Sequence, residues 1–274
     1  MHNVTIDAIT IGQGHPLALI AGPCVLESRD LAFQIAEAVQ RITDELRMPF
    51  IFKGSFDKAN RTSLHAVRGP GLYEGLEILA AVRHEFHVPV CTDFHEPDQA
   101  AIIAGVVDLL QVPAFLCRQT DILLAAAETG KATSVKKGQF LAPWDMRNVV
   151  DKFTAGGNHA LLLTERGASF GYNNLIVDPR SFPVMREFGY PVIFDATHSA
   201  QLPGGTGTAT GGQREFIPAL VRAAVAVGVD ALFMEVHPEP EKGLSDATTM
   251  WPLARLRAVL ESAQRLDAAG GRSW

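Results

Sequence analysis

The sequence predicts an α/β protein, a closed (β/α)8 barrel of the TIM-barrel type, and three observations point to it. Eight short runs of β-branched and aliphatic residues recur along the 274 residues, and a stretch with helical periodicity follows each run. Strands that alternate with helices are parallel, because each crossover helix returns the chain to the same edge of the sheet. The length fits the roughly 250 residues typical of this barrel. No linker rich in Pro, Gly or Ser divides the chain, so we expect one domain over 1–274.

The expected strands are apolar runs that look buried on both faces, as the strands of a parallel sheet are. They are residues 17–21, 50–53, 88–92, 109–112, 132–135, 160–163, 192–194 and 231–235. Ahead of them, residues 4–11 alternate apolar and polar and predict a small β-hairpin that closes the bottom of the barrel. An open doubly wound sheet is built from the same units and stays the structural alternative.

The helix expected after the first strand has the clearest pattern. Leu31, Ile35, Val39 and Ile42 recur at spacings of three and four, and Ser28 is placed to cap the amino end. The other expected helices are residues 72–86, 97–104, 120–128, 145–155, 179–188, 213–227 and 251–268.

Composition excludes several classes of protein. With 47% hydrophobic residues and a net charge of −6, the chain is neither disordered nor a basic nucleic-acid binder. The longest apolar segments, such as residues 219–236, are interrupted by Arg222 and Asp230, so we expect no membrane-spanning helix. The amino terminus lacks the pattern of a secretory signal, and the three scattered cysteines predict no disulfide framework. We therefore expect a cytoplasmic protein.

The positions at the carboxyl ends of the expected strands are unusually polar, and active sites of such barrels lie there. Five cations converge on that end of an acidic protein, which favours a substrate with more than one phosphate or carboxylate group. These cations are Lys53, Lys58, Arg61, Lys136 and Arg166. No Gly-rich nucleotide motif opens a helix. The Gly-rich segment 203–212 is interpreted either as a mobile lid or as a plain connection.

Four potential metal ligands also belong to this end of the barrel. Cys24, His198 and Glu235 follow or end the first, seventh and eighth strands, and Asp246 lies in the loop beyond. The eighth and first strands are neighbours in a closed barrel, so these side chains are expected to meet. A set of Cys, His and carboxylates suits zinc, iron(II) or manganese.

Motifs along nearly the whole chain, from about residue 17 to 255, closely resemble the 3-deoxy-D-manno-octulosonate 8-phosphate (KDO8P) synthase family. The matching segments are 20–27 (IAGPCVLE), 52–63 (FKGSFDKANRTS), 93–96 (DFHE), 111–115 (QVPAF), 136–139 (KKGQ), 165–167 (ERG), 170–172 (FGY), 195–199 (DATHS) and 235–238 (EVHP). The resemblance implies an enzyme that condenses phosphoenolpyruvate with arabinose 5-phosphate and water in lipopolysaccharide biosynthesis.

The resemblance also implies roles for the polar residues. Lys136 and Arg166 would hold the phosphate of phosphoenolpyruvate. Around the rest of that substrate would lie Lys53, Ser55, Lys58, Gln111 and Ala114. The phosphate of the sugar would be held, partly across a subunit contact of a homotetramer, by Asn60, Arg61, Thr62 and Ser63. The related 3-deoxy-arabino-heptulosonate 7-phosphate synthases, which use erythrose 4-phosphate, usually carry Lys-Pro-Arg-Thr there. They remain the alternative, although residues 58–61 (KANR) favour the five-carbon sugar.

The same family contains metal-dependent members with Cys at the position of Cys24 and metal-independent members with Asn. The Cys in this chain implies a divalent metal ion held by Cys24, His198, Glu235 and Asp246, with its identity left open. Asp93, His198 and Asp246 are the candidates for moving protons. Two rival classes stay open: a Schiff-base aldolase that uses Lys136 or Lys53, and a barrel that binds sugar phosphates without turnover.

Overall fold

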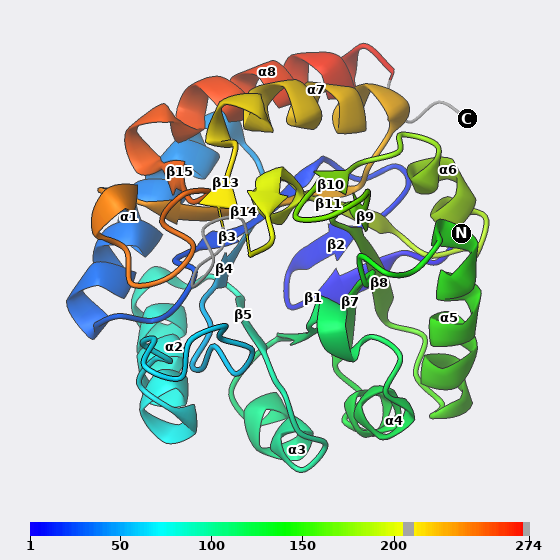
Figure 1. Ribbon diagram of the computed structural model, residues 1–274, viewed down its shortest axis with the longest axis horizontal. Coiled ribbons are helices and arrows are strands. Elements are labelled where there is room, and N and C mark those ends of the chain that lie inside the picture. The colour runs from blue at the N-terminus through cyan, green and yellow to red at the C-terminus, as the bar shows by residue number, and fades with distance from the viewer. Residues whose placement is uncertain (205–210, 271–274) are drawn as a thin grey trace.

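Eight parallel strands close into a barrel inside a ring of helices, as Figure 1 shows for the computed structural model, which describes residues 1–204 and 211–270. The barrel strands are β3 (Ala18–Gly22), β4 (Phe50–Lys53), β5 (Val90–Asp93), β6 (Leu109–Val112), β7 (Ala132–Lys136), β8 (Leu161–Glu165), β11 (Val192–Asp195) and β14 (Ala231–His237). Each strand pairs in parallel with the next along the chain, and β14 pairs with β3 as well as with β11. That last pairing closes the barrel and excludes the open sheet.

One helix follows each barrel strand, which is the arrangement the sequence predicts. The helices are α1 (Arg29–Leu46), α2 (Leu72–Phe86), α3 (Gln99–Ala104), α4 (Thr120–Glu128), α5 (Met146–Ala155), α6 (Ser181–Arg186), α7 (Ile217–Val227) and α8 (Leu256–Ala268). The Ser28 hydroxyl caps α1 by accepting the Leu31 backbone N–H at 3.2 Å, which confirms the expected cap.

Several helices are shorter than expected, and the last two show why. Before α7, residues Arg214–Phe216 form a 3-10 turn, and Pro218 then occupies the first turn of the helix, where proline is tolerated. Before α8, the expected helix from residue 251 is wrong at its start, because Trp251–Pro252 pair with the end of β14 as the short strand β15. Leu253–Arg255 then form another 3-10 turn.

The strands divide the core into two layers, since alternate side chains point to opposite faces of a strand. One layer fills the barrel interior and includes Ile20, Ile51, Leu162 and Phe233. The other layer packs the outside of the barrel against the helices. The predicted hairpin is present as β1 (Val4–Ile6) and β2 (Ile9–Ile11), and its buried side chains join the interior layer.

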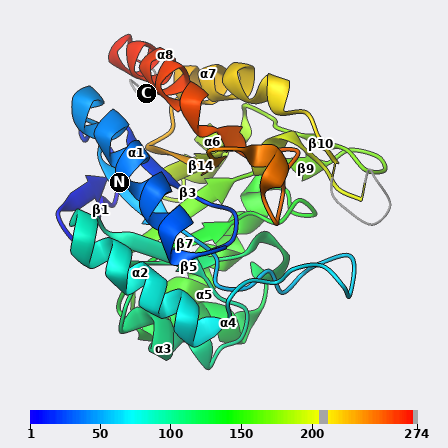
Figure 2. The ribbon, with the colours of Figure 1, turned by 90° about the vertical axis from the view of Figure 1, so that its left-hand side faces the viewer.

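The hairpin therefore closes one end of the barrel, and the longer loops gather at the other end. Figure 2 shows β1 on one side of the molecule, with the cyan loop after β4 and the short strands β9 (Ala168–Ser169) and β10 (Leu175–Ile176) on the opposite side. Two more short strands, β12 (Gln201–Leu202) and β13 (Gly211–Gly212), pair at the base of segment 203–212. Residues 205–210 of the proposed lid lie outside the described residues.

Within the described ranges, no helix combines the length and apolar character needed to cross a membrane. All three cysteines are free and buried.

Candidate active site

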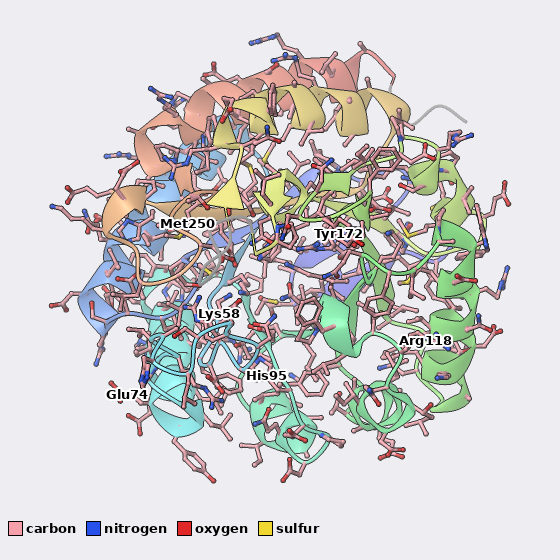
Figure 3. All side chains as sticks on the ribbon, viewed as in Figure 1. Lys58, Glu74, His95, Arg118, Tyr172 and Met250 are labelled. Atoms are coloured by element: carbon pink, nitrogen blue, oxygen red, sulfur yellow. The ribbon has the colours of Figure 1, made fainter. Side chains whose placement is uncertain are left out.

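A cavity of about 630 Å³ opens at the carboxyl ends of the barrel strands. Most of the site residues selected from the sequence line it: Lys53, Lys58, Asn60, Arg61, Thr62, Ser63, Asp93, Gln111, Ala114, Lys136, Arg166, His198, Glu235 and Asp246. Figure 3 shows the Lys58 and His95 side chains inside the ring of helices. Cys24 and Ser55 are buried and do not line the cavity, but each contacts a residue that does. The tertiary structure thus brings all of these residues together.

Two buried cations form the side of the cavity nearest β7 and β8. Lys136 ends β7, and its Nζ lies 2.5 Å from Asp195 Oδ2 and 3.7 Å from the centre of the Phe233 ring. Burial lowers the pKa of Lys136, although the Asp195 carboxylate opposes this shift. Arg166 follows β8 and donates from Nη2 to Gln201 Oε1 at 2.9 Å. Its Nη1 has no hydrogen-bond partner among the described residues, so one donor of a buried guanidinium remains for an anionic ligand.

A polar chain runs across the ends of β4 and β5. Lys53 Nζ donates to Ser55 Oγ at 2.6 Å, and Ser55 Oγ donates to Asp93 Oδ1 at 2.5 Å. His95 Nε2 lies 3.3 Å from the other oxygen of Asp93. Burial by itself would raise the pKa of Asp93, but Lys53, His95 and Lys58 together lower it well below its usual range. Asp93 is therefore ionised, and it accepts the hydrogen bond from Ser55 as a carboxylate.

Three of the four expected metal ligands form a tight cluster. The ligand atoms of Cys24, Glu235 and Asp246 all lie within 4.8 Å of one another. His198 is not part of that set, but its Nε2 lies 3.6 Å from Glu235 Oε1 and 3.6 Å from Asp246 Oδ2. The second carboxylate oxygen of Glu235, Oε2, is buried without a hydrogen-bond partner in the described part of the chain. A thiol, two carboxylates and an imidazole in this arrangement fit a divalent cation.

Burial and nearby charges determine which groups of this cluster carry a proton. Burial raises the pKa of the Cys24 thiol, and the nearby Asp246 and Glu235 carboxylates raise it further. Burial and these carboxylates therefore favour the protonated thiol at Cys24. Burial opposes the ionised form of Glu235, yet Lys58, His198 and Lys53 hold its pKa well below the usual range. Lys58 Nζ lies 3.5 Å from Glu235 Oε1, and this ion pair joins the metal-ligand cluster to the cationic side of the cavity.

Residues 60–63 form the outer wall of the cavity, beyond β4. Asn60 and Thr62 are exposed, whereas Arg61 and Ser63 are half-buried. Arg61 donates from Nε to the carbonyl of Val67 at 2.9 Å and from Nη2 to the carbonyl of Leu244 at 3.2 Å. These hydrogen bonds hold the Arg61 guanidinium at the outer part of the cavity, apart from Lys136 and Arg166. The site therefore has two regions of positive charge.

Two residues that the sequence analysis did not select connect these parts. The buried Asp195 carboxylate holds Lys136 and also His198, whose Nδ1 lies 2.8 Å from Oδ2. Gln201 donates from Nε2 to Asp246 Oδ2 at 3.0 Å while its Oε1 accepts from Arg166. Asp195 is the last residue of β11, so the rule that strand ends carry the site could have identified it. Gln201 begins the short strand β12, and no spacing in the sequence indicates its position.

A cavity at the carboxyl ends of a (β/α)8 barrel, lined by cations in two separate regions, is typical of an enzyme that acts on phosphorylated substrates. The chain belongs to the DAHP synthetase I family, because the model of that family matches residues 2–269. It is similar to the 2-dehydro-3-deoxyphosphooctonate aldolase of Trichlorobacter lovleyi, with 59% identity over 97% of both chains. It is 61% identical, over 94% of both chains, to the protein of the same name from Cyanothece sp.. The protein of that name from Methylococcus capsulatus is 59% identical over 94% of this chain and 91% of its own.

Proposed function

We propose that this chain condenses phosphoenolpyruvate with D-arabinose 5-phosphate and water, and forms 3-deoxy-D-manno-octulosonate 8-phosphate and phosphate. The observation that carries this function is the identity of about 60%, over nearly the full length, to several relatives named 2-dehydro-3-deoxyphosphooctonate aldolase. That name denotes the enzyme also called 3-deoxy-8-phosphooctulonate synthase. The name of these relatives favours arabinose 5-phosphate over erythrose 4-phosphate as the second substrate. The matching family, DAHP synthetase I, is itself named after the enzyme that makes the seven-carbon product.

The buried cations supply the binding site for phosphoenolpyruvate. Lys136 and Arg166 hold its phosphate, which is supported by their burial and by the free Nη1 donor of Arg166. The remainder of the substrate lies among Lys53, Ser55, Lys58, Gln111 and Ala114. Burial strengthens these interactions because little solvent screens them.

The outer wall holds the phosphate of the sugar, with Asn60, Arg61, Thr62 and Ser63 as its ligands. The half-exposed state of this segment supports a site that a neighbouring subunit completes, in a homotetramer. With one phosphate near Lys136 and the other near Arg61, the two substrates meet between these cations, in the part of the cavity lined by Asp93 at the end of β5 and by Glu235 in β14. Holding two reactants face to face lowers the activation barrier by on the order of 7 kcal/mol in favourable cases.

The chemistry forms one carbon–carbon bond and one carbon–oxygen bond from water, and it breaks the carbon–oxygen bond to the phosphate group. The methylene carbon of phosphoenolpyruvate attacks the aldehyde carbon of the open-chain sugar, water adds to the adjacent carbon, and phosphate leaves from that carbon. The attacking water loses both of its protons: the aldehyde oxygen gains one, and the leaving phosphate takes the other as the ketone forms. Asp93, His198 and Asp246 are the groups that move these protons, which is supported by their places in the lining of the cavity. Lys53 and Lys136 offset the negative charge of the two phosphates.

Cys24, His198, Glu235 and Asp246 hold a divalent metal ion, so the chain is of the metal-dependent type. Such an ion supplies Lewis-acid chemistry, which polarises a carbonyl oxygen or a water molecule. Treatment with a chelator is expected to abolish turnover, and zinc, iron(II) or manganese to restore it. Undiminished turnover by protein shown to be free of metal would overturn this assignment.

The decisive experiment is phosphate release from phosphoenolpyruvate in the presence of each sugar. Arabinose 5-phosphate is expected to give stoichiometric phosphate and erythrose 4-phosphate little or none, with each substrate alone as a control. Faster release with erythrose 4-phosphate would assign the alternative reaction, and binding without release would assign a non-catalytic protein. Trapping of a substrate carbonyl on Lys136 or Lys53 by borohydride would assign a Schiff-base aldolase.

We further propose that the chain works as a single catalytic domain over 1–274 in the cytoplasm. Continuous pairing from β3 to β14 supports the single domain, because every described barrel strand depends on both of its neighbours.

A further inference from the structure

Behind the cavity lies a buried ion pair that no step of the proposed reaction uses. Lys137 Nζ is 3.4 Å from Glu165 Oε1, and the two side chains are only 1% and 2% exposed. Removing two charges from water is costly, and replacing such a pair with apolar side chains is often neutral or stabilising. A buried pair at this position therefore calls for a role other than stability.

The pair holds both backbone polar groups of the residue that follows Arg166. Glu165 Oε1 accepts the N–H of Gly167 at 2.6 Å, and Lys137 Nζ donates to the carbonyl of Gly167 at 3.2 Å. Gly167 has φ +91°, a conformation that glycine adopts without strain. The direction in which the chain leaves Arg166 is thus determined by the two charged side chains.

The same lysine also holds the loop that follows Lys136. Its Nζ donates to the carbonyl of Leu141 at 3.3 Å and approaches that of Gly138 at 3.5 Å. The two loops are joined once more where the N–H of Ser169 donates to the carbonyl of Gln139 at 2.8 Å. One ammonium group therefore ties the ends of β7 and β8 together.

Successive side chains at the ends of β7 and β8 point in opposite directions, and this places the pair behind two residues of the cavity. Lys136 lines the cavity and the next residue, Lys137, is buried behind it. Likewise Arg166 lines the cavity, and the residue before it, Glu165, is buried behind it. We propose that Lys137 and Glu165 are positioning residues, which hold Lys136 and Arg166 at the spacing that binds the phosphate of phosphoenolpyruvate. This inference rests on the proposed function.

Three variants test the pair: Lys137→Met, Glu165→Gln and the double variant. Lys137→Met is expected to raise KM for phosphoenolpyruvate at least tenfold and to leave KM for arabinose 5-phosphate within twofold. Glu165→Gln keeps the shape and an oxygen for the Gly167 N–H, so a smaller rise of at least threefold is expected. The double variant should resemble Lys137→Met rather than multiply the two effects, because both substitutions break the same interaction.

The matched control is Arg186→Met, which breaks another buried pair. Arg186 Nη2 lies 2.9 Å from Asp230 Oδ2, and Arg186 also contacts Met1, near the amino terminus and away from the cavity. This variant is expected to lower the Tm without changing KM for phosphoenolpyruvate. If Lys137→Met and Glu165→Gln also lower the Tm and leave that KM within twofold, the pair is merely structural and the inference is refuted.

The design separates this inference from the proposed function. Absence of phosphate release from the wild-type protein would refute the function, whereas an active wild-type protein with unchanged variants would refute only the inference. Calorimetric titration with phosphoenolpyruvate alone gives the same comparison without turnover, and there the expected result is weaker binding by Lys137→Met and Glu165→Gln. Should Lys137→Met fail to fold, Glu165→Gln decides.

Discussion

At the scale of single residues, the site is an alternation of buried cations and anions. Lys53 lies between Asp93 and Glu235, at 3.6 and 3.7 Å, and Lys136 is paired with Asp195. Each charge makes the burial of its neighbours tolerable, because an unpaired charge in this environment would cost several kcal/mol. The substitution of one such residue therefore changes the ionisation of the residues around it as well as its own contact with substrate.

Asp93 provides a test of this electrostatic network through pH. Its pKa is lowered in the folded protein, and an unfolded aspartate titrates near 3.9. Its ionisation therefore stabilises the fold above about pH 4, and this contribution is lost as pH falls below that value. We expect the free energy of unfolding of the wild-type protein to fall more steeply than that of Asp93→Asn as the pH is lowered below about 4, measured by urea denaturation. Parallel pH profiles would contradict the paired state of Asp93.

Cys24 provides a test of the metal assignment that does not depend on activity. Cys24→Ala removes one of three clustered ligands, so we expect it to weaken zinc binding by at least about tenfold, measured by competition with a chromogenic chelator. The control is Cys117→Ala, which deletes a buried thiol outside that cluster and should leave zinc affinity unchanged. Equal zinc affinity of the wild type and Cys24→Ala would show that Cys24 is not a ligand.

At the scale of elements, the close approach of β3 and β4 determines where the site residues lie. Gly22 ends β3, and a Cβ atom placed there would lie 1.9 Å from the carbonyl oxygen of Lys53. Backbone cannot move aside as a flexible side chain can, so the absence of a side chain at Gly22 lets Cys24 and Lys53 come together at neighbouring strand ends.

Gly22→Ala is accordingly expected to be destabilising by about 3 kcal/mol, as in strongly overpacked cores. Urea denaturation measures this change. Gly105→Ala is the matched control, because its nearest contact would be 3.3 Å and its φ of −69° suits any residue. We expect that variant to change stability by less than about 1 kcal/mol. Comparable losses in the two variants would show that the β3–β4 approach can relax.

At the scale of the whole molecule, the two ends of the barrel have different roles. The hairpin β1–β2 fills one end with apolar side chains, and the cavity occupies the other. The chain has a net charge of −6, yet its cavity concentrates cations. The lining has five Lys and Arg side chains against four Asp and Glu side chains, so the cavity is more favourable to anionic substrates than the acidic molecule as a whole.

Exposed aromatic side chains occur on the loops at the cavity end, and they bear on the expected tetramer. Phe140, Phe170 and Tyr172 are 55%, 66% and 99% exposed, and Figure 3 shows Tyr172 near β9 and β10. Burial of such side chains between subunits would be favourable. We expect sedimentation equilibrium to give four times the mass of one chain, and Tyr172→Asp with Phe170→Asp to lower it. A wild-type monomer would contradict the tetramer.

The apolar patterns were sufficient to predict all eight barrel strands, the hairpin and the strand ends at which the site lies. The alternation of strands with helices, and therefore the parallel sheet, could be inferred from local composition. A strand that is buried on both faces is apolar whichever strands pair with it. The starts of α7 and α8 were not predictable in this way, since 3-10 turns and the pairing of β15 with β14 depend on neighbours distant in the sequence.

The sequence by itself therefore determined the kind of fold and the residue types available for chemistry, since both depend on local patterns and on motifs. Only the tertiary structure decided which of these residues touch. The sharing of Asp195 between Lys136 and His198, and the burial of Lys137 against Glu165, come from side chains that different strands bring together. Their energies depend on distance and burial, and a linear sequence specifies neither until the barrel has closed.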